Sequence, residues 1–218
     1  MNRPARLVVA ALTASTALLL TACGSGGGDD SSSDKIKGSD ADGKKASASA
    51  PASSPTAQDG AGRPKITLSK DFQANFQGWT NSDPKLQAIL DDGREELRSE
   101  YAAVIEANVN SDAVAFYNSD ATLITAHKWI KQFVDDDESL IGSVTAFDPQ
   151  VHINDTGSGV LFYCVDERKA STKNRKTAKI TTTPDKPENV IQYRNRLDKN
   201  PQGVWKTTSS TVVPGACG

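Results

Sequence analysis

PKLQAILDDGREELRSEYAAVIEA, the segment at residues 84–107, shows most directly how this chain folds. Its apolar residues recur on one helical stripe: Leu86, Ile89, Leu90, Leu97, Tyr101, Val104 and Ile105. The charged residues are assigned to the other side: Asp91, Asp92, Arg94, Glu95, Arg98 and Glu100. This period predicts a long amphipathic helix over 84–107, with Asp83 as its N-cap and Pro84 in its first turn. Gly93 either weakens the helix locally or lets another element approach it.

Two shorter helices are expected after the long one. Asn110 or Ser111 could cap a helix over 113–117, and Asp120 could cap another. We expect this last helix to end at about Val134, because the three aspartates that follow it oppose the helix dipole.

Strands are expected from Ser139 onward. The candidate strand segments are 144–146 with Val151 and Ile153, then 160–165, 190–197 and 204–213, separated by turns at 156–159 and 200–203 and by a polar stretch at 166–189. Asp148-Pro149 interrupts the first of them and predicts a bulge or bend. Helices followed by a hairpin-connected sheet predict an α+β fold.

The aromatic residues define the extent of the folded part. All six Phe, four Tyr and three Trp lie between Phe72 and Trp205, so a single domain is expected over 65–218. Phe72, Phe76 and Trp79 recur at helical spacing, and we expect this lead-in segment to pack its aromatics on the core.

Residues 1–22 have the organisation of an export signal. Arg3 and Arg6 precede an apolar stretch, Leu7–Leu20, that is short for a transmembrane helix. Leu20-Thr21-Ala22-Cys23 resembles the lipobox of bacterial lipoproteins at all four positions. The resemblance implies cleavage before Cys23 and its lipidation, including acyl chains such as palmitate. The expected location is then the extracytoplasmic face of the cell membrane, with the membrane as partner through the lipid anchor. The alternative is an ordinary secretory signal with a chance cysteine.

The segment between Cys23 and the domain is expected to be a disordered spacer. Residues 23–64 consist mainly of Gly, Ser, Ala, Asp, Lys and Pro, with Ile36 as an isolated larger aliphatic side chain. Such a composition cannot bury enough apolar surface to offset the entropy of ordering it.

The two remaining cysteines, Cys164 and Cys217, are expected to form a disulfide, because an exported protein matures in an oxidising compartment. The alternative is a pair of free thiols. A metal site is not expected, because only His127 and His152 are available as imidazole ligands. The acidic run 135–138 lacks the ligand alternation of a calcium loop, so no metal or other cofactor is predicted.

The order of elements is similar to that of the nuclear-transport-factor-2-like or ketosteroid-isomerase-like fold. Together with the lipobox it also resembles a set of actinobacterial surface lipoproteins with such a domain. The segments that carry the resemblance are Phe76-Gln77-Gly78-Trp79, Ala126-His127-Lys128-Trp129-Ile130, Tyr163-Cys164 and Gly203-Val204-Trp205. The resemblance implies N-terminal helices that close a strongly curved antiparallel sheet into a cone.

An enzyme built on such a cone would place an acid or base beside a partner in the cavity. The candidates are His127, His152, Tyr117, Tyr163 and Asp148. No signature joins any of them into an acid–base pair, and nucleophile and phosphate-binding motifs are absent from the sequence. We therefore predict no catalytic residues.

The charge of the chain argues against nucleic acid as a partner and leaves anionic surfaces as a possible one. The chain has 25 basic and 27 acidic residues, so losing Arg3 and Arg6 with the leader leaves 23 and 27, or −4. This balance gives no footprint for nucleic acid. Residues 168–179 hold six basic residues and no acidic one, which could form a basic finger for anionic surfaces or a solvated loop.

Three functions remain open. The favoured one is a non-catalytic module that binds a small apolar ligand or an envelope protein. The first alternative is an isomerase- or dehydratase-like enzyme, which a buried acid facing a tyrosine inside the cone would support. The second is a purely structural envelope protein, which a filled interior would support.

Overall fold

The structure of the protein is a computed structural model that describes residues 61–217. The predicted signal peptide, the lipidation site Cys23 and the spacer up to residue 60 lie outside the described residues. Three α-helices, one short 3₁₀-helix (η1) and seven strands occur in the order β1 Phe72–Phe76, α1 Pro84–Glu106, α2 Asp112–Tyr117, α3 Asp120–Asp135, β2 Glu138–Ile153, β3 Gly159–Asp166, β4 Ala170–Asn174, β5 Ile180–Thr182, η1 Pro187–Asn189, β6 Val190–Lys199 and β7 Trp205–Pro214. The predicted α+β class is confirmed.

Helix α1 matches its prediction closely. The Asp83 side chain accepts a hydrogen bond from the Lys85 N–H at 2.8 Å, and Pro84 is the first helical residue. Gly93 serves the second of its two expected roles, the approach of another element. A Cβ there would lie 2.6 Å from Cδ2 of buried Leu161 on β3, so the helix rests on the sheet at this residue.

Helix α3 is capped one residue earlier than predicted. Asp120 is its first residue, and Ser119 is the N-cap, whose N–H donates to the Thr122 hydroxyl at 3.1 Å. The helix ends at Asp135, where the carboxylate pairs with Lys131 at 2.6 Å. This i,i+4 pair favours ending the helix one residue after the predicted Val134.

The sheet is antiparallel in the order β5-β4-β2-β3-β6-β7, and β1 pairs with β2 in parallel. The predicted antiparallel sheet is therefore correct except for β1, which was expected only as a lead-in, and for β4 and β5, which lie in the polar stretch 166–189 where no strand was predicted. Its sequence alternates, so that Phe72 is buried and Ala74 and Phe76 pack against the core. A spacing of four residues fits a strand as well as a helix, because four is a multiple of the strand period.

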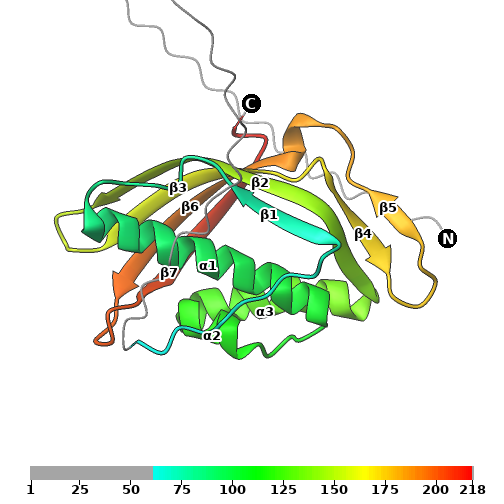
Figure 1. The fold of residues 1–218 in the computed structure, drawn as a ribbon, viewed down its shortest axis with the longest axis horizontal. Coiled ribbons are helices and arrows are strands. Elements are labelled where there is room, and N and C mark those ends of the chain that lie inside the picture. The colour runs from blue at the N-terminus through cyan, green and yellow to red at the C-terminus, as the bar shows by residue number, and fades with distance from the viewer. Residues whose placement is uncertain (1–60, 218) are drawn as a thin grey trace, which may run out of the picture. The chain divides into compact units, whose positions relative to one another are not determined.

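Strand β2 bends twice and gives the sheet its curvature. Its first part pairs with β4 and its second part with β3. Between them Gly142 adopts φ 88°, and a Cβ there would meet the Lys169 carbonyl oxygen at 2.3 Å. The register then shifts between Phe147 and Gln150, which confirms the bulge predicted at Asp148-Pro149. Figure 1 shows the sheet arching over the helices, with the concave face toward α1 and α3.

The predicted disulfide is present. Cys164 on β3 is bonded to Cys217, with Cα atoms 6.0 Å apart and a sequence separation of 53. The end of the described chain is thus held to the middle of the sheet.

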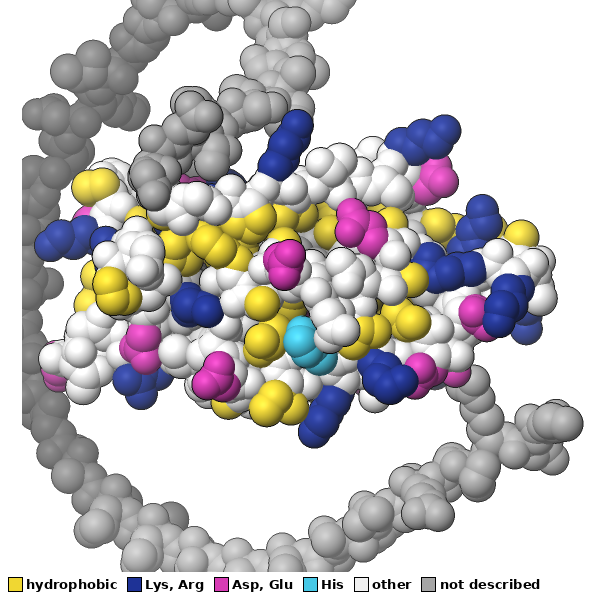
Figure 2. Space-filling view, turned by 90° about the horizontal axis from the view of Figure 1, so that it is seen from below, with side chains coloured by type: hydrophobic (Ala, Val, Ile, Leu, Met, Phe, Trp, Pro, Cys, Tyr) yellow, Lys and Arg dark blue, Asp and Glu magenta, His cyan; other side chains and the backbone are white. Residues whose placement is uncertain are grey.

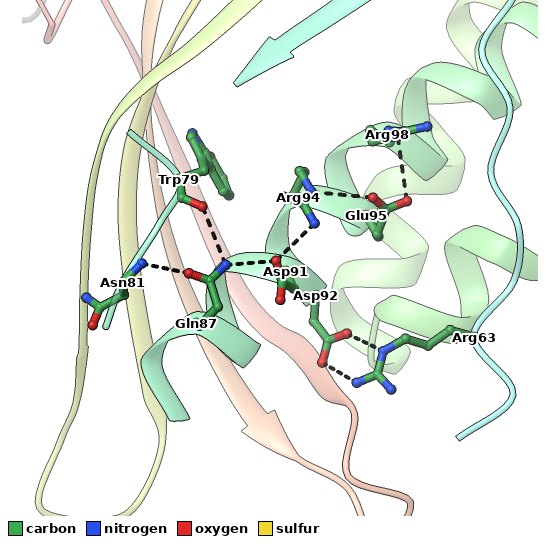
Figure 3. A network of polar contacts seen from close by, with 9 residues as sticks. All are labelled: Arg63, Trp79, Asn81, Gln87, Asp91, Asp92, Arg94, Glu95 and Arg98. Carbon is green, nitrogen blue, oxygen red and sulfur yellow. Dashed lines mark hydrogen bonds and ion pairs between the residues drawn. The ribbon is translucent and has the colours of Figure 1, made fainter. Parts of the chain in front are cut away.

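The outer side of α1 is joined to the segment that enters the domain (Figure 3). Asp92, only 1 % exposed, accepts two hydrogen bonds from the Arg63 guanidinium at 2.8 and 3.0 Å. Its Oδ2 also accepts from the Trp205 N–H at 2.9 Å. Asp92 is therefore not on an exposed face, as the helical pattern predicted, but is a buried, fully paired carboxylate that joins three segments.

Candidate functional site

The concave face of the sheet and helices α1 and α3 enclose a cavity of about 390 Å³. Phe72, Trp129 and Phe133 contribute aromatic walls, and Leu140 and Val144 of β2 add aliphatic ones. Three lining residues are exposed, namely Thr125 on α3 and Ser210 and Val212 on β7, and they mark where the cavity reaches solvent. The interior of the domain is hollow, which removes the observation that would have favoured a purely structural protein.

A pair of glutamates from α1 projects into this cavity. Glu96 is 6 % exposed and accepts a hydrogen bond from Nδ2 of Asn118 at 3.3 Å. The carboxyl groups of Glu96 and Glu100 are close enough for each to affect the pKa of the other. Burial raises the pKa of Glu96 from its ordinary value of 4.5 to about 7. Burial and the neighbouring Glu96 raise the pKa of Glu100 as well, so the pair retains a proton at neutral pH.

A third carboxyl group reaches the cavity from the loop between β3 and β4. Glu167 lines the cavity, and burial together with the charge of Asp166 raises its pKa to about 7. The adjacent Arg168 does not neutralise it, because Arg168 pairs with Asp166 at 2.8 Å and with Asp185 at 3.1 Å. Within the described chain, the three cavity carboxyl groups are therefore without a basic partner.

Three tyrosines lie around the carboxyl groups. Tyr101 and Tyr193 line the cavity, and Tyr163 stacks on Tyr193 with ring centroids 5.0 Å apart. Burial raises the pKa of all three phenols, and for each of them at least two of the three glutamates contribute as well. The phenols therefore stay protonated, and their hydroxyls are available for hydrogen bonds inside the cavity.

Two amides complete the polar part of the cavity. Nδ2 of Asn118 donates to Glu96 and to the Val114 carbonyl oxygen, so its donors are used. The buried Oδ1 of Asn195 and the buried hydroxyl of Tyr101 have no hydrogen-bond partner among the described residues, although the Asn195 side chain lies close enough to the Tyr163 phenol to lower its pKa. Other buried polar atoms of the described part, such as Trp79 Nε1, also lack a partner, but these two belong to residues that line the cavity and are therefore positioned to contact a ligand.

The five residues considered as catalytic candidates do not form this site. His152 is exposed on β2, and Asp148 is exposed at the bulge with φ 51°. His127 lies half-buried on α3 outside the cavity lining, and Tyr117 belongs to a second apolar cluster. Only Tyr163 is close, behind Tyr193, as a packed sheet aromatic.

The glutamates of α1 were missed because the sequence pattern placed Glu100 on the charged side of the helix. In the structure Glu100 lines the cavity. The signal was present in the spacing. Glu96 and Glu100 stand seven and eleven residues after buried Ile89, and these steps return to the same helix face. A carboxyl group within an apolar stripe is expensive unless paired, which makes it a functional candidate.

The acidic run 135–138 and the basic stretch 168–179 find most of their partners within the domain. Asp135 pairs with Lys131, and Asp137 pairs with Lys176 at 2.7 Å. Arg175 donates to the carbonyl oxygens of Val104 and Ile105 at the end of α1. The basic stretch is thus a β4–β5 hairpin, part of which holds the fold together.

Among residues 61–217, no three His, Cys, Asp or Glu side chains gather closely enough to hold a metal ion. No helix in this part combines the length and hydrophobicity needed to cross a membrane. Viewed from the side of the helices, the surface mixes acidic and basic side chains around hydrophobic ones (Figure 2).

No known protein family matches the sequence, and no curated protein matches it. Solved structures with a similar fold include the intermembrane-space region of the chloroplast protein ARC6, at 9% identity over 62% of this chain and 99% of that chain, with TM-score 0.44. The protein Aln2 from a Streptomyces species is similar at 10% identity over 62% and 94%, with TM-score 0.43. A protein from Catenulispora acidiphila is similar at 10% identity over 58% and 91%, with TM-score 0.41. These likenesses assign no family.

Proposed function

We propose that this protein is a lipid-anchored, extracytoplasmic binding module whose nuclear-transport-factor-2-like domain takes up a small, largely apolar ligand. The observation that carries the proposal is the cavity of about 390 Å³, which has aromatic walls and a few polar groups at one side. Pockets of this size and composition are typical of small-molecule sites. The complete lipobox at residues 20–23 supports the location.

Binding to the cavity can be tested with the uncharged fluorophore N-phenyl-1-naphthylamine. Thr125→Trp places a large side chain at the mouth of the cavity, and Ile124→Trp places one on the adjacent position, which is 56 % exposed and outside the lining. We expect the wild type and Ile124→Trp to bind the fluorophore alike and Thr125→Trp to lose at least about tenfold in affinity, or about 1.4 kcal/mol. Equal binding by all three proteins would contradict the proposal.

The anchor can be tested by fractionating cells that express the Cys23→Ala variant. The wild type is expected in the membrane fraction and to be released by detergent. The variant is expected in the soluble extracytoplasmic fraction if lipid on Cys23 is the attachment. A variant that is cleaved and still sediments with membranes would contradict the anchor.

A second function is favoured by one specific observation, the carboxyl pair Glu96–Glu100 beside Tyr101. A carboxyl group with a pKa of about 7 can accept and return a proton at neutral pH, and a phenol can stabilise an oxyanion. The pair would thus suit proton transfer next to a carbonyl group, as in an isomerase. The measurement is α-proton exchange of an apolar ketone such as 2-cyclohexenone in D₂O. Catalysed exchange that Glu100→Gln abolishes and exposed Glu106→Gln retains would favour the enzyme.

A further inference from the structure

The charge of the cavity lining restricts the class of ligand that the cavity can bind. Glu96, Glu100 and Glu167 line it, and the described residues of the lining include no Lys, Arg or His. The carboxyl groups are desolvated by burial, and no basic side chain of the described chain contributes to the pKa of any of them. A cavity of this kind attracts positive charge and repels anions.

The hydrogen-bonding groups of the cavity also favour a positively charged ligand. The unpaired Oδ1 of Asn195 is an acceptor. The amide N–H groups of Asn118 already donate to Glu96 and to the Val114 carbonyl oxygen. Ionised carboxylates only accept, and a phenol oxygen can do so too. The Tyr101 hydroxyl, on a side chain 3 % exposed, adds a further buried group without a partner among the described residues. The polar groups of the cavity thus include carboxyl and amide acceptors, and no basic side chain among residues 61–217 lines the cavity beside them.

The rest of the cavity suits an apolar body with a cationic end. Aromatic faces from Phe72, Trp129 and Tyr193 line it beside the carboxyl groups. Such faces attract a cation and also pack on hydrocarbon. A primary ammonium group supplies three N–H donors and a positive charge, which satisfies both kinds of unpaired group at once.

We infer that the cavity binds a small organic amine as its ammonium ion, with the N–H donors on the Glu96–Glu100 pair and the apolar body against the aromatic walls. This inference rests on the proposed binding function and specifies the class of ligand. It assigns Glu96, Glu100 and Glu167 as binding residues and Tyr101 and Asn195 as neutral acceptors around the ammonium group.

Three probes of one shape separate charge from hydrophobicity. They are 2-phenylethylamine, which is a cation, propylbenzene, which is neutral, and 3-phenylpropanoate, which is an anion. Each is measured by displacement of N-phenyl-1-naphthylamine at pH 8. The amine is expected to bind at least about tenfold more tightly than propylbenzene, because a hydrogen bond to a charged group is worth about 1.5–3 kcal/mol. The anion is expected to bind most weakly.

The charge of the protein is varied with one matched pair. Glu100→Gln keeps the shape of a cavity residue and removes one carboxyl group of the Glu96–Glu100 pair. Glu106→Gln makes the same change on an exposed residue of the same helix, outside the lining. The amine advantage over propylbenzene is expected to fall about tenfold in the first variant and to stay unchanged in the second. Propylbenzene itself is expected to bind all three proteins alike, which shows that the cavity remains folded.

The pH dependence supplies an independent measurement. The titratable groups around the ammonium position are Glu96, Glu100 and Tyr101 from α1, Glu167 from the β3–β4 loop, Tyr163 from β3 and Tyr193 from β6. The phenols do not ionise below pH 8, and the amine stays protonated because amine pKa values are about 10. Because the pKa values of Glu96 and Glu167 are about 7, amine affinity is expected to rise between pH 5 and pH 8 as these two carboxyl groups ionise, while propylbenzene affinity stays level.

The outcomes separate the two proposals. If the fluorophore binds the cavity but the amine has no advantage over propylbenzene, the binding module stands and the amine inference is overturned. If the anion binds most tightly, the inference is also overturned, and the oxyanion site of the enzyme alternative gains support. If Thr125→Trp leaves fluorophore binding unchanged, both proposals are overturned. Only an amine advantage that Glu100→Gln removes supports the inference.

Discussion

Asp92 and Glu96 stand one turn apart on α1, and both are buried acidic residues. Asp92 is surrounded by donors, with the Arg63 guanidinium and the Trp205 N–H on its oxygens. Glu96 receives one amide donor, from Asn118, and shares its other contact with another carboxyl group. A fully paired buried charge serves the fold, whereas an unpaired one destabilises it and is retained for another reason. Pairing, rather than burial, separates the structural residue from the residue proposed to bind a ligand.

Replacing Asp92 tests the structural role. Asp92→Ala leaves the Arg63 guanidinium without its carboxylate and the Trp205 N–H without an acceptor. We expect a loss of about 3 kcal/mol in the free energy of unfolding, measured by urea denaturation. The neighbouring Asp91→Ala removes an exposed pair with Arg94 and is expected to cost less than about 1 kcal/mol. Similar losses in the two variants would contradict the role given to Asp92.

Replacing Glu96 tests whether a buried carboxyl group without a basic partner destabilises the fold, through the pH dependence of the free energy of unfolding. Its pKa is about 7 in the folded protein and has an ordinary value of 4.5, so the folded state holds an extra proton between these values. The stabilising contribution of the protonated group is therefore complete below pH 4.5 and is lost as pH rises through 7, by about 3 kcal/mol. In thermal unfolding at several pH values, Glu96→Gln should reduce this decline and be more stable than the wild type at pH 8. A variant with an unchanged pH slope would rule out the shifted pKa.

At the level of elements, the sequence predicted best where local signals were strong. Helix α1 has an N-cap, a first-turn proline and a sustained apolar stripe, and its limits agree within one residue. Strand β1 was missed because its pairing partner, β2, lies more than sixty residues further along the chain. Strands β4 and β5 are polar, and their position depends on pairing with β2 rather than on burial of their own side chains.

The site was less predictable than the fold for a related reason. Helical periodicity identifies the buried face from apolar residues and assigns charged ones to solvent by default. Beside a cavity this default assignment fails for a few residues, because the buried face of the helix can then carry carboxyl groups. Tyr193 and Asn195 also alternate with exposed Arg194 in β6, which looks like an ordinary half-buried strand.

The β4–β5 hairpin contributes to α1 through a single side chain. Arg175 donates to the carbonyl oxygens of Val104 and Ile105 and also to that of Glu138, at 2.9 Å. Arg175→Ala leaves the last turn of the helix without this cap, and we expect a loss of about 1–2 kcal/mol in urea denaturation. Lys176→Ala, which removes an exposed ion pair from the same hairpin, is expected to cost less than about 0.5 kcal/mol. If both substitutions are equally mild, the hairpin does not support the helix.

At the level of the whole molecule, the disulfide ties the segment that follows the edge strand β7 to β3 in the middle of the sheet. Cys164 lies at the centre of β3, and Cys217 follows β7, whose residues Ser210 and Val212 line the mouth of the cavity. The bond therefore limits how far the last strand can move away from the sheet. The mouth gains rigidity from a link made outside the cavity itself.

Removing the disulfide tests its share of the stability. A bond that closes a loop of this length contributes about 4 kcal/mol on the chain-entropy model. We expect the Cys164→Ser/Cys217→Ser variant to unfold at a lower urea concentration by an amount that corresponds to this value. The wild type should show no free thiol when it is denatured without reductant. A denatured wild type that reacts with thiol reagents would contradict the bond.

The contact between Arg63 and Asp92 also has a mechanical consequence. A pull on the entering segment at Arg63 acts on this ion pair and, further along the chain, on the Ile66 carbonyl held by Arg98. Both contacts lie before β1, the first strand that contributes to the cavity wall. Under load the entering segment would peel off before the walls around Glu96 move. Such a load would therefore lengthen the entering segment before it changes the shape of the cavity.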